Sequence, residues 1–239
     1  MTKKERRKRI IYPTLLMLCL LLVSCQTDSY EKGEGEYSLL QADFAELYVD
    51  GQKQGVSFTT DEGATIQLTP PYTAKWIETA DTTYRTIVYY SLSANGATPS
   101  ANSPATAQAE AIGAVVTMHP VPQWKFKNLP QDPIGVESVW LSRNGKYLNL
   151  SLLVKTGRVS DEELPHNIGL AQDTVYIRDD GRRTAYWRLL HSQNGIPQYY
   201  TNRRYASVAL PTNAPDTICL TIPTFEGPQQ RTVTINNKR

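Results

Sequence analysis

The residue types best suited to catalysis or metal binding are three histidines, His119, His166 and His191. None has a second histidine or a cysteine at the spacing of a zinc site, and the sequence contains no HExxH, CxxC, GxSxG, P-loop or GxGxxG motif. His166 and His191 both fall in or beside predicted strands, where the fold can bring them together. We predict structural histidines and no catalytic residue, metal site or cofactor.

Two runs of carboxylates are the other candidates for chemistry. Asp161-Glu162-Glu163 lies in a polar connection, and Asp179-Asp180 lies in a hairpin turn, where aspartate favours the backbone geometry. Neither run has the spaced Asp-x-Asp-x-Asp/Asn-Gly pattern of a calcium loop. A glycosidase-like pair depends on the distance between carboxylates in the fold, so a hydrolase is kept as a third functional hypothesis.

The strongest candidate for binding is the aromatic and basic stretch GIPQYYTNRRY. Tyrosine and arginine favour interface hot spots because they combine a large contact area with directed hydrogen bonds. A purely structural alternative is a strand pair with the tyrosines in the core and the arginines outside. The binding surface that we predict consists of Tyr199, Tyr200, Arg203, Arg204 and Tyr205.

Cys25 ends a segment with the features of an export signal. A block of six basic residues and one acidic residue precedes an apolar run from Ile10 to Val23. A membrane-spanning helix needs about 20 apolar residues, so this run is too short to span and fits a secretory signal over residues 1–24. The last residues, Leu22-Val23-Ser24-Cys25, resemble a bacterial lipobox. The resemblance implies cleavage before Cys25, a diacylglyceryl group on its Sγ and acylation of the new amine.

Cleavage at this position changes the charge of the protein. The full chain has 25 basic and 23 acidic residues, and the part from Cys25 onward has 19 and 22, a net charge of about −3. No Lys/Arg cluster of the kind that binds nucleic acid remains, so we predict no nucleic-acid partner. Residues 25–36 form an acidic tether that resembles surface-export signals of some lipoproteins. We therefore predict an outer-membrane lipoprotein, on the periplasmic side or at the cell surface.

The elements that position these residues are short strands throughout. Between residues 37 and 121, five alternating segments separated by Gly, Pro and Asp predict an OB-like five-stranded barrel. A proline-rich linker, residues 122–135, follows. Residues 136–239 contain seven segments at sandwich-like spacing and predict an immunoglobulin-like β-sandwich, without the Cys–Trp–Cys signature of true immunoglobulin domains. Cys219 alternates with apolar neighbours, and we predict that it lies in the core.

The sandwich segments carry a family resemblance. The stretches KYLNLSLLVKTG and HNIGLAQDTVYIRDDGRRTAYWRLLHSQNGIPQYYT, together with the lipobox and the barrel, resemble NigD-like lipoproteins of Bacteroides-type bacteria. The resemblance implies an all-β protein with an OB-like domain followed by a β-sandwich. The family is named after a bacteriocin gene cluster in which an immunity role was suspected, and it supplies no catalytic residues.

Three functions follow as hypotheses. The first is a non-enzymatic binding protein of the outer membrane, immunity-like, whose partner is a protein, a peptide toxin or a glycan. The second is a structural accessory subunit of an envelope or surface complex. The third is a hydrolase that acts on envelope polymers and needs a cluster of Asp, Glu or His in a deep cleft.

Overall fold

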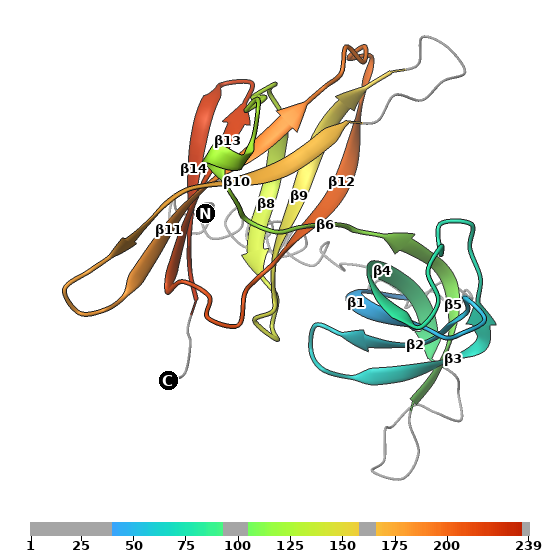
Figure 1. Cartoon of the computed structure of the whole chain (residues 1–239). Helices are drawn as coiled ribbons and strands as arrows, with labels where there is room; N and C mark the ends of the chain where they lie inside the picture. Colours follow the sequence, from blue (N-terminus) through green and yellow to red (C-terminus); the bar gives the residue numbers. More distant parts are fainter. Residues whose placement is uncertain (1–39, 93–104, 158–165, 236–239) are drawn as a thin grey trace, which may run out of the picture. The chain divides into compact units, whose positions relative to one another are not determined.

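The computed structural model describes residues 40–92, 105–157 and 166–235, all within one compact unit (Figure 1). The predicted signal peptide, the lipidation site Cys25, the tether and the Asp161-Glu162-Glu163 run lie outside the described residues. Within the described ranges, no helix is long and apolar enough to cross a membrane.

The first part of the chain is a closed five-stranded barrel with the order β1-β2-β3-β5-β4, as predicted. Leu47, Phe58, Leu68 and Val88 fill its interior and are at most 4% exposed. Each comes from a different strand, in which every second side chain points into the barrel, because successive residues of a strand face opposite sides. The strands are β1 (Gln41–Val49), β2 (Gly55–Thr60), β3 (Thr65–Tyr72), β4 (Thr82–Leu92) and β5 (Ala105–Ala114).

The predicted fifth strand does not continue through residue 121. β5 ends at Ala114, and the chain then contributes two short strands, β6 (Val116–Met118) and β7 (Val121–Pro122), to the sheets of the following sandwich. A 3-10 turn, η3 (Gln123–Lys125), follows. Prolines at 120 and 122 lack a backbone N–H and favour short edge strands over one long strand. The domain boundaries at 121 and 136 stay predictions.

The second part of the chain is a β-sandwich, as predicted. One sheet has the order β14-β13-β11-β10-β7 and the other has the order β6-β12-β9-β8 (Figure 1). Neighbouring strands of these two sheets pair antiparallel except β11 with β13, β10 with β7 and β12 with β6, which run parallel. β11 and β13 run parallel because the intervening β12 belongs to the opposite sheet. The strands are β8 (Gly135–Leu141), β9 (Tyr147–Thr156), β10 (Asn167–Ile177), β11 (Arg183–Ser192), β12 (Tyr200–Ala209), β13 (Thr217–Thr224) and β14 (Gly227–Thr234).

One hydrophobic core joins the two sheets. Leu148, Leu150 and Leu152 of β9 are fully buried, as their alternation predicts, and they belong to the same cluster as Trp187 of β11. The core prediction for Cys219 is wrong. Cys219 lies on the opposite face of β13 from its buried neighbours and is only half-buried, because residues on successive positions of a strand point to opposite faces.

Candidate functional site

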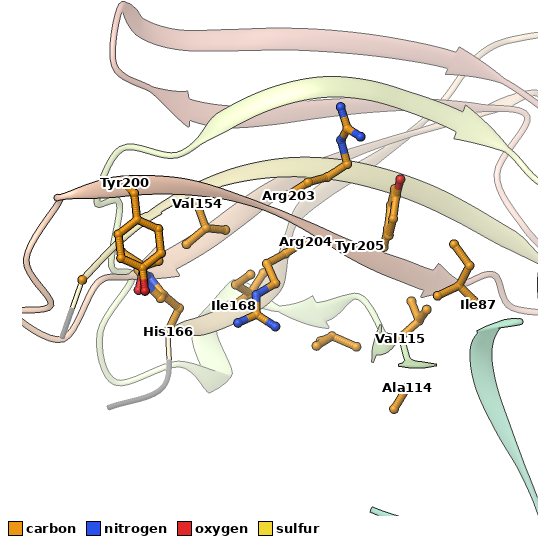
Figure 2. A pocket seen from close by; sticks show the side chains of 13 residues that line it. Ile87, Ala114, Val115, Val154, His166, Ile168, Tyr200, Arg203, Arg204 and Tyr205 are labelled. Atoms are coloured by element: carbon orange, nitrogen blue, oxygen red, sulfur yellow. The ribbon is translucent and has the colours of Figure 1, made fainter. Parts of the chain in front are cut away.

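The predicted Tyr–Arg surface lies at the start of β12. Tyr199 precedes the strand and Tyr200 begins it, and both rings are well exposed, at 75% and 53%. The structural alternative of tyrosines in the core and arginines outside does not hold. Arg204 shares the face of β12 that carries buried Ala206, whereas Arg203 points the other way (Figure 2). β12 therefore presents one arginine on each side of its sheet.

The outer arginine, Arg203, has an acidic partner. Its guanidinium lies 2.6 Å from Glu137 of β8, and the Ser151 hydroxyl donates to the same carboxylate at 2.7 Å. Hydrogen bonds from Ser151 and Arg203 lower the pKa of Glu137. The ring of Tyr205 on the same face packs edge-on against Phe44 of β1, with the ring centroids 5.3 Å apart. Arg203 and Tyr205 are thus held by neighbours within the protein.

The inner arginine, Arg204, faces a pocket of about 630 Å³ (Figure 2). Apolar side chains of Val115, Val154 and Ile168 line it together with His166, and none of the lining residues that the structure describes is an aspartate or glutamate. Of the five predicted binding residues, Tyr200, Arg203, Arg204 and Tyr205 line this pocket. Tyr199 is not among the lining residues.

His166, which lines the pocket, contacts His191, a pairing that the sequence allowed but did not predict. His166 Nδ1 lies 3.0 Å from His191 Nε2, and the rings stack at 12°. His191 is 1% exposed, and its Nδ1 lies 3.0 Å from the carbonyl oxygen of Asp132. Burial, and then the charges of His191 and Arg204, lower the pKa of His166. Within the described ranges, no three His, Cys, Asp or Glu side chains are grouped to hold a metal ion.

Because the pKa of His166 is lowered, the free energy of unfolding varies with pH in the mildly acidic range. Below about 6.5, the unfolded chain binds a proton at this residue more readily than the folded protein does, so stability falls as the pH falls. We expect the urea midpoint to be lower at pH 5.0 than at pH 7.5, with a smaller difference in His166→Gln. Glu46 and Glu137, whose pKa values are lowered from 4.5, stay charged over this range. If the urea midpoints of wild type and His166→Gln changed equally with pH, His166 would not be the source of the pH dependence.

A second polar cluster, centred on Arg85 of β4, joins the barrel to the sandwich. Its guanidinium donates to both Asp61 oxygens at 2.6 and 2.7 Å, and to Asn149 Oδ1 of β9 at 3.1 Å and Ser207 Oγ of β12 at 3.2 Å. The same group lies over the ring of Tyr147, 4.0 Å from its centroid. The Arg85 side chain is 2% exposed, so it is a buried cation paired with the Asp61 carboxylate.

Glu46 of β1 extends this connection. It accepts hydrogen bonds from Lys146 Nζ at 2.9 Å and from the Tyr147 hydroxyl at 2.8 Å. Burial opposes ionisation of Glu46, but these two hydrogen bonds and the charges of Lys146 and Arg85 outweigh it and lower its pKa. Burial and the bond to Glu46 raise the pKa of Tyr147 to about 12. The cluster thus keeps a charged carboxylate beside a neutral phenol.

The sequence did not identify this cluster. Alternation along β4 correctly places Arg85 on the outside of the barrel, but a position outside one module gives no sign that another module covers it. Asp61 is 24 residues away and Asn149 is 64 residues away. No local spacing in the sequence links these residues. Predicting the cluster would have required knowing how the barrel packs against the sandwich.

Comparison with solved structures places this fold among known proteins of Bacteroides. The chain is similar to a NigD-like immunity protein from Bacteroides caccae, with 22% identity and a TM-score of 0.59 over 81% of this chain and 91% of that one. It is also similar to a "putative lipoprotein" from Bacteroides fragilis, with 12% identity and a TM-score of 0.56 over 84% and 99% of the two chains. No protein-family model and no curated protein matches the chain.

These likenesses show a shared fold that spans both the barrel and the sandwich. They agree with the fold that the NigD-like resemblance implies, a barrel followed by a β-sandwich. The class that fold and site define is a two-module all-β protein with a Tyr- and Arg-lined pocket beside β12.

Proposed function

We propose that this chain is a non-enzymatic binding protein of the outer membrane whose partner is a protein, with an immunity-like role. The observation that carries the proposal is the Tyr–Arg surface of β12. It combines two exposed tyrosines with a pocket and an inward-facing arginine, in a fold shared with a NigD-like immunity protein. Immunity would work by sequestering a toxin or by masking its receptor.

The chemistry of the surface suits a protein ligand. Tyrosine side chains supply broad contact area at low entropic cost, and arginine supplies directed hydrogen bonds, so both residues favour interface hot spots. A net charge of about −3 after residue 24 disfavours a nucleic-acid partner. A glycan would use the same aromatic rings, and it is the alternative ligand.

Membrane attachment is proposed through Cys25. Cells given an alkyne-tagged fatty acid are expected to label the wild-type chain, and the chain should sediment with the outer membrane. Cys25→Ala is expected to lose the label and to leave the membrane fraction, because several acyl chains at about 0.8 kcal/mol per buried CH₂ are needed for stable anchoring. Cys219→Ala is the matched control and should keep both properties. Labelling of the Cys25→Ala chain would refute lipidation at this residue.

The two alternative functions make different demands. An accessory subunit of an envelope complex would co-purify in stable stoichiometry with neighbouring envelope proteins. A glycosidase-like hydrolase needs two carboxylates on either side of the bond that it cleaves. None of the described residues that line the pocket beside β12 is an Asp or Glu, so their geometry does not favour glycoside hydrolysis there.

A protection assay tests the immunity-like role. A strain that lacks the chain is exposed to bacteriocin preparations from related producers, and its survival is compared after complementation with wild type or with Tyr200→Ala. We expect wild type to protect against at least one preparation. Tyr200→Ala should protect less, because it removes an exposed aromatic contact without touching the core. Equal killing of the deleted and complemented strains by every preparation would count against immunity.

A further inference from the structure

The pocket beside β12 lies where the sandwich core opens. Val154 and Ile168 continue the apolar surface of the two sheets, and Val115 adds a third aliphatic wall from the connection that follows the barrel. At about 630 Å³, the pocket falls within the range of small-ligand sites, roughly 300–1,000 Å³. Its apolar walls therefore offer burial to one or a few side chains.

Two polar groups that line the pocket, the Arg204 guanidinium and His166 Nε2, have no partner in the described part of the chain. Arg204 has no carboxylate at ion-pair distance in the described part of the chain, unlike its neighbour Arg203. His166 Nε2 is buried and has no hydrogen-bond partner there. An arginine without an acid, beside an unpaired ring nitrogen, favours an anionic oxygen ligand, because a guanidinium fork matches a carboxylate with two parallel hydrogen bonds.

The backbone at the pocket also has an open side. β12 pairs with β9 along its whole length, from Tyr200 to Ala209. On its other side it pairs with β6 only through Ala206–Val208. In the described ranges, no strand covers that side of residues 200–205. An open strand edge binds an added extended strand through its unpaired N–H and C=O groups.

We propose that this pocket binds an extended acidic segment of the partner protein, which pairs with the open edge of β12 and places a carboxylate on Arg204. Aliphatic side chains of the segment, flanking the acid, pack against Val115, Val154 and Ile168. The open backbone edge distinguishes a peptide from a small amphipathic acid, because only another backbone pairs with it. This inference rests on the proposed function and names the chemistry of its partner.

A fixed-position peptide library tests the proposal. Octapeptides with one position held as Glu, Gln or Lys and the others randomised are captured by the immobilised full-length chain and sequenced. We expect Glu over Gln by about tenfold, consistent with a charge-assisted hydrogen bond, and Val, Ile or Leu enriched near the acid. Arg204→Glu is expected to reverse the preference toward Lys. Arg143→Ala should keep the preference for Glu, because Arg143 is paired with Glu62 and does not line the pocket.

Two results of the library experiment would overturn the proposal, and a third result would come from a glycan. One is a library with no enrichment over beads that carry no protein. The other is a preference for Glu that persists unchanged in Arg204→Glu, with an unchanged urea midpoint showing that this exposed substitution leaves the fold intact. Retention of an envelope polysaccharide that acidic peptides do not displace would point to a glycan and also overturn it. Protection of cells without enrichment of peptides would leave the proposed function standing and remove only this inference.

Discussion

Replacing Arg85 with methionine is expected to lower the free energy of unfolding by about 3–5 kcal/mol, because one partner of a buried ion pair is removed and the other stays buried. Asp61 would lose both short contacts, and Asn149 and Ser207 would lose a shared donor. Urea unfolding, followed by tryptophan fluorescence, measures the change. Arg85→Lys is expected to recover only part of the loss, since an ammonium cannot make the bidentate contact.

The matched control is Arg143, whose guanidinium lies 3.3 Å from Glu62. Both side chains of that pair are well exposed, so Arg143→Met is expected to change stability by less than about 1 kcal/mol. A similar small effect at Arg85 would mean that the junction between the barrel and the sandwich is not held by this cluster. A double-mutant cycle with Asp61→Asn isolates the pairwise part of the loss.

Replacing Trp187 with alanine is expected to cost about 3–5 kcal/mol, the range for deleting a large buried aromatic side chain. Trp187 is 1% exposed and lies in the core between the two sheets. Its neighbour Tyr186 points to the other face of β11 and is 38% exposed. Tyr186→Ala is therefore the control, with an expected change within about 0.5 kcal/mol. Equal losses of unfolding free energy for Trp187→Ala and Tyr186→Ala would contradict the structure, in which only Trp187 points into the core.

The sequence predicted features of the fold that depend on local alternation. Leu148, Leu150 and Leu152 recur every second residue and all reach the core. The same rule, applied to Cys219, assigned the correct strand and the wrong face. Alternation shows that neighbours point to opposite sides, and the choice of core side has to come from the buried residues around them. Ile218 and Leu220 are bulkier and more apolar, and they take the core side.

The candidate site was predictable in its composition and not in its geometry. The Tyr–Arg stretch identified four of the residues that line the pocket. Its two arginines are adjacent in the sequence, but their surroundings differ. Arg203 is paired with Glu137, whereas Arg204 faces the pocket. The contact between His166 and His191 arises because β10 and β11 are antiparallel neighbours, with His191 opposite Ile168 in the register. Such pairings come from register across strands, which a single sequence does not specify.

The proposed function requires that the face of β12 beside the pocket binds a protein. Site-specific photocrosslinking in growing cells tests it most directly, with a photoreactive phenylalanine analogue in place of Tyr200, which is 53% exposed. The matched control carries the same analogue at Tyr176, which is 59% exposed on β10. We expect one discrete protein adduct at position 200 and none at 176. No adduct at either position, or the same adduct at both, would contradict it.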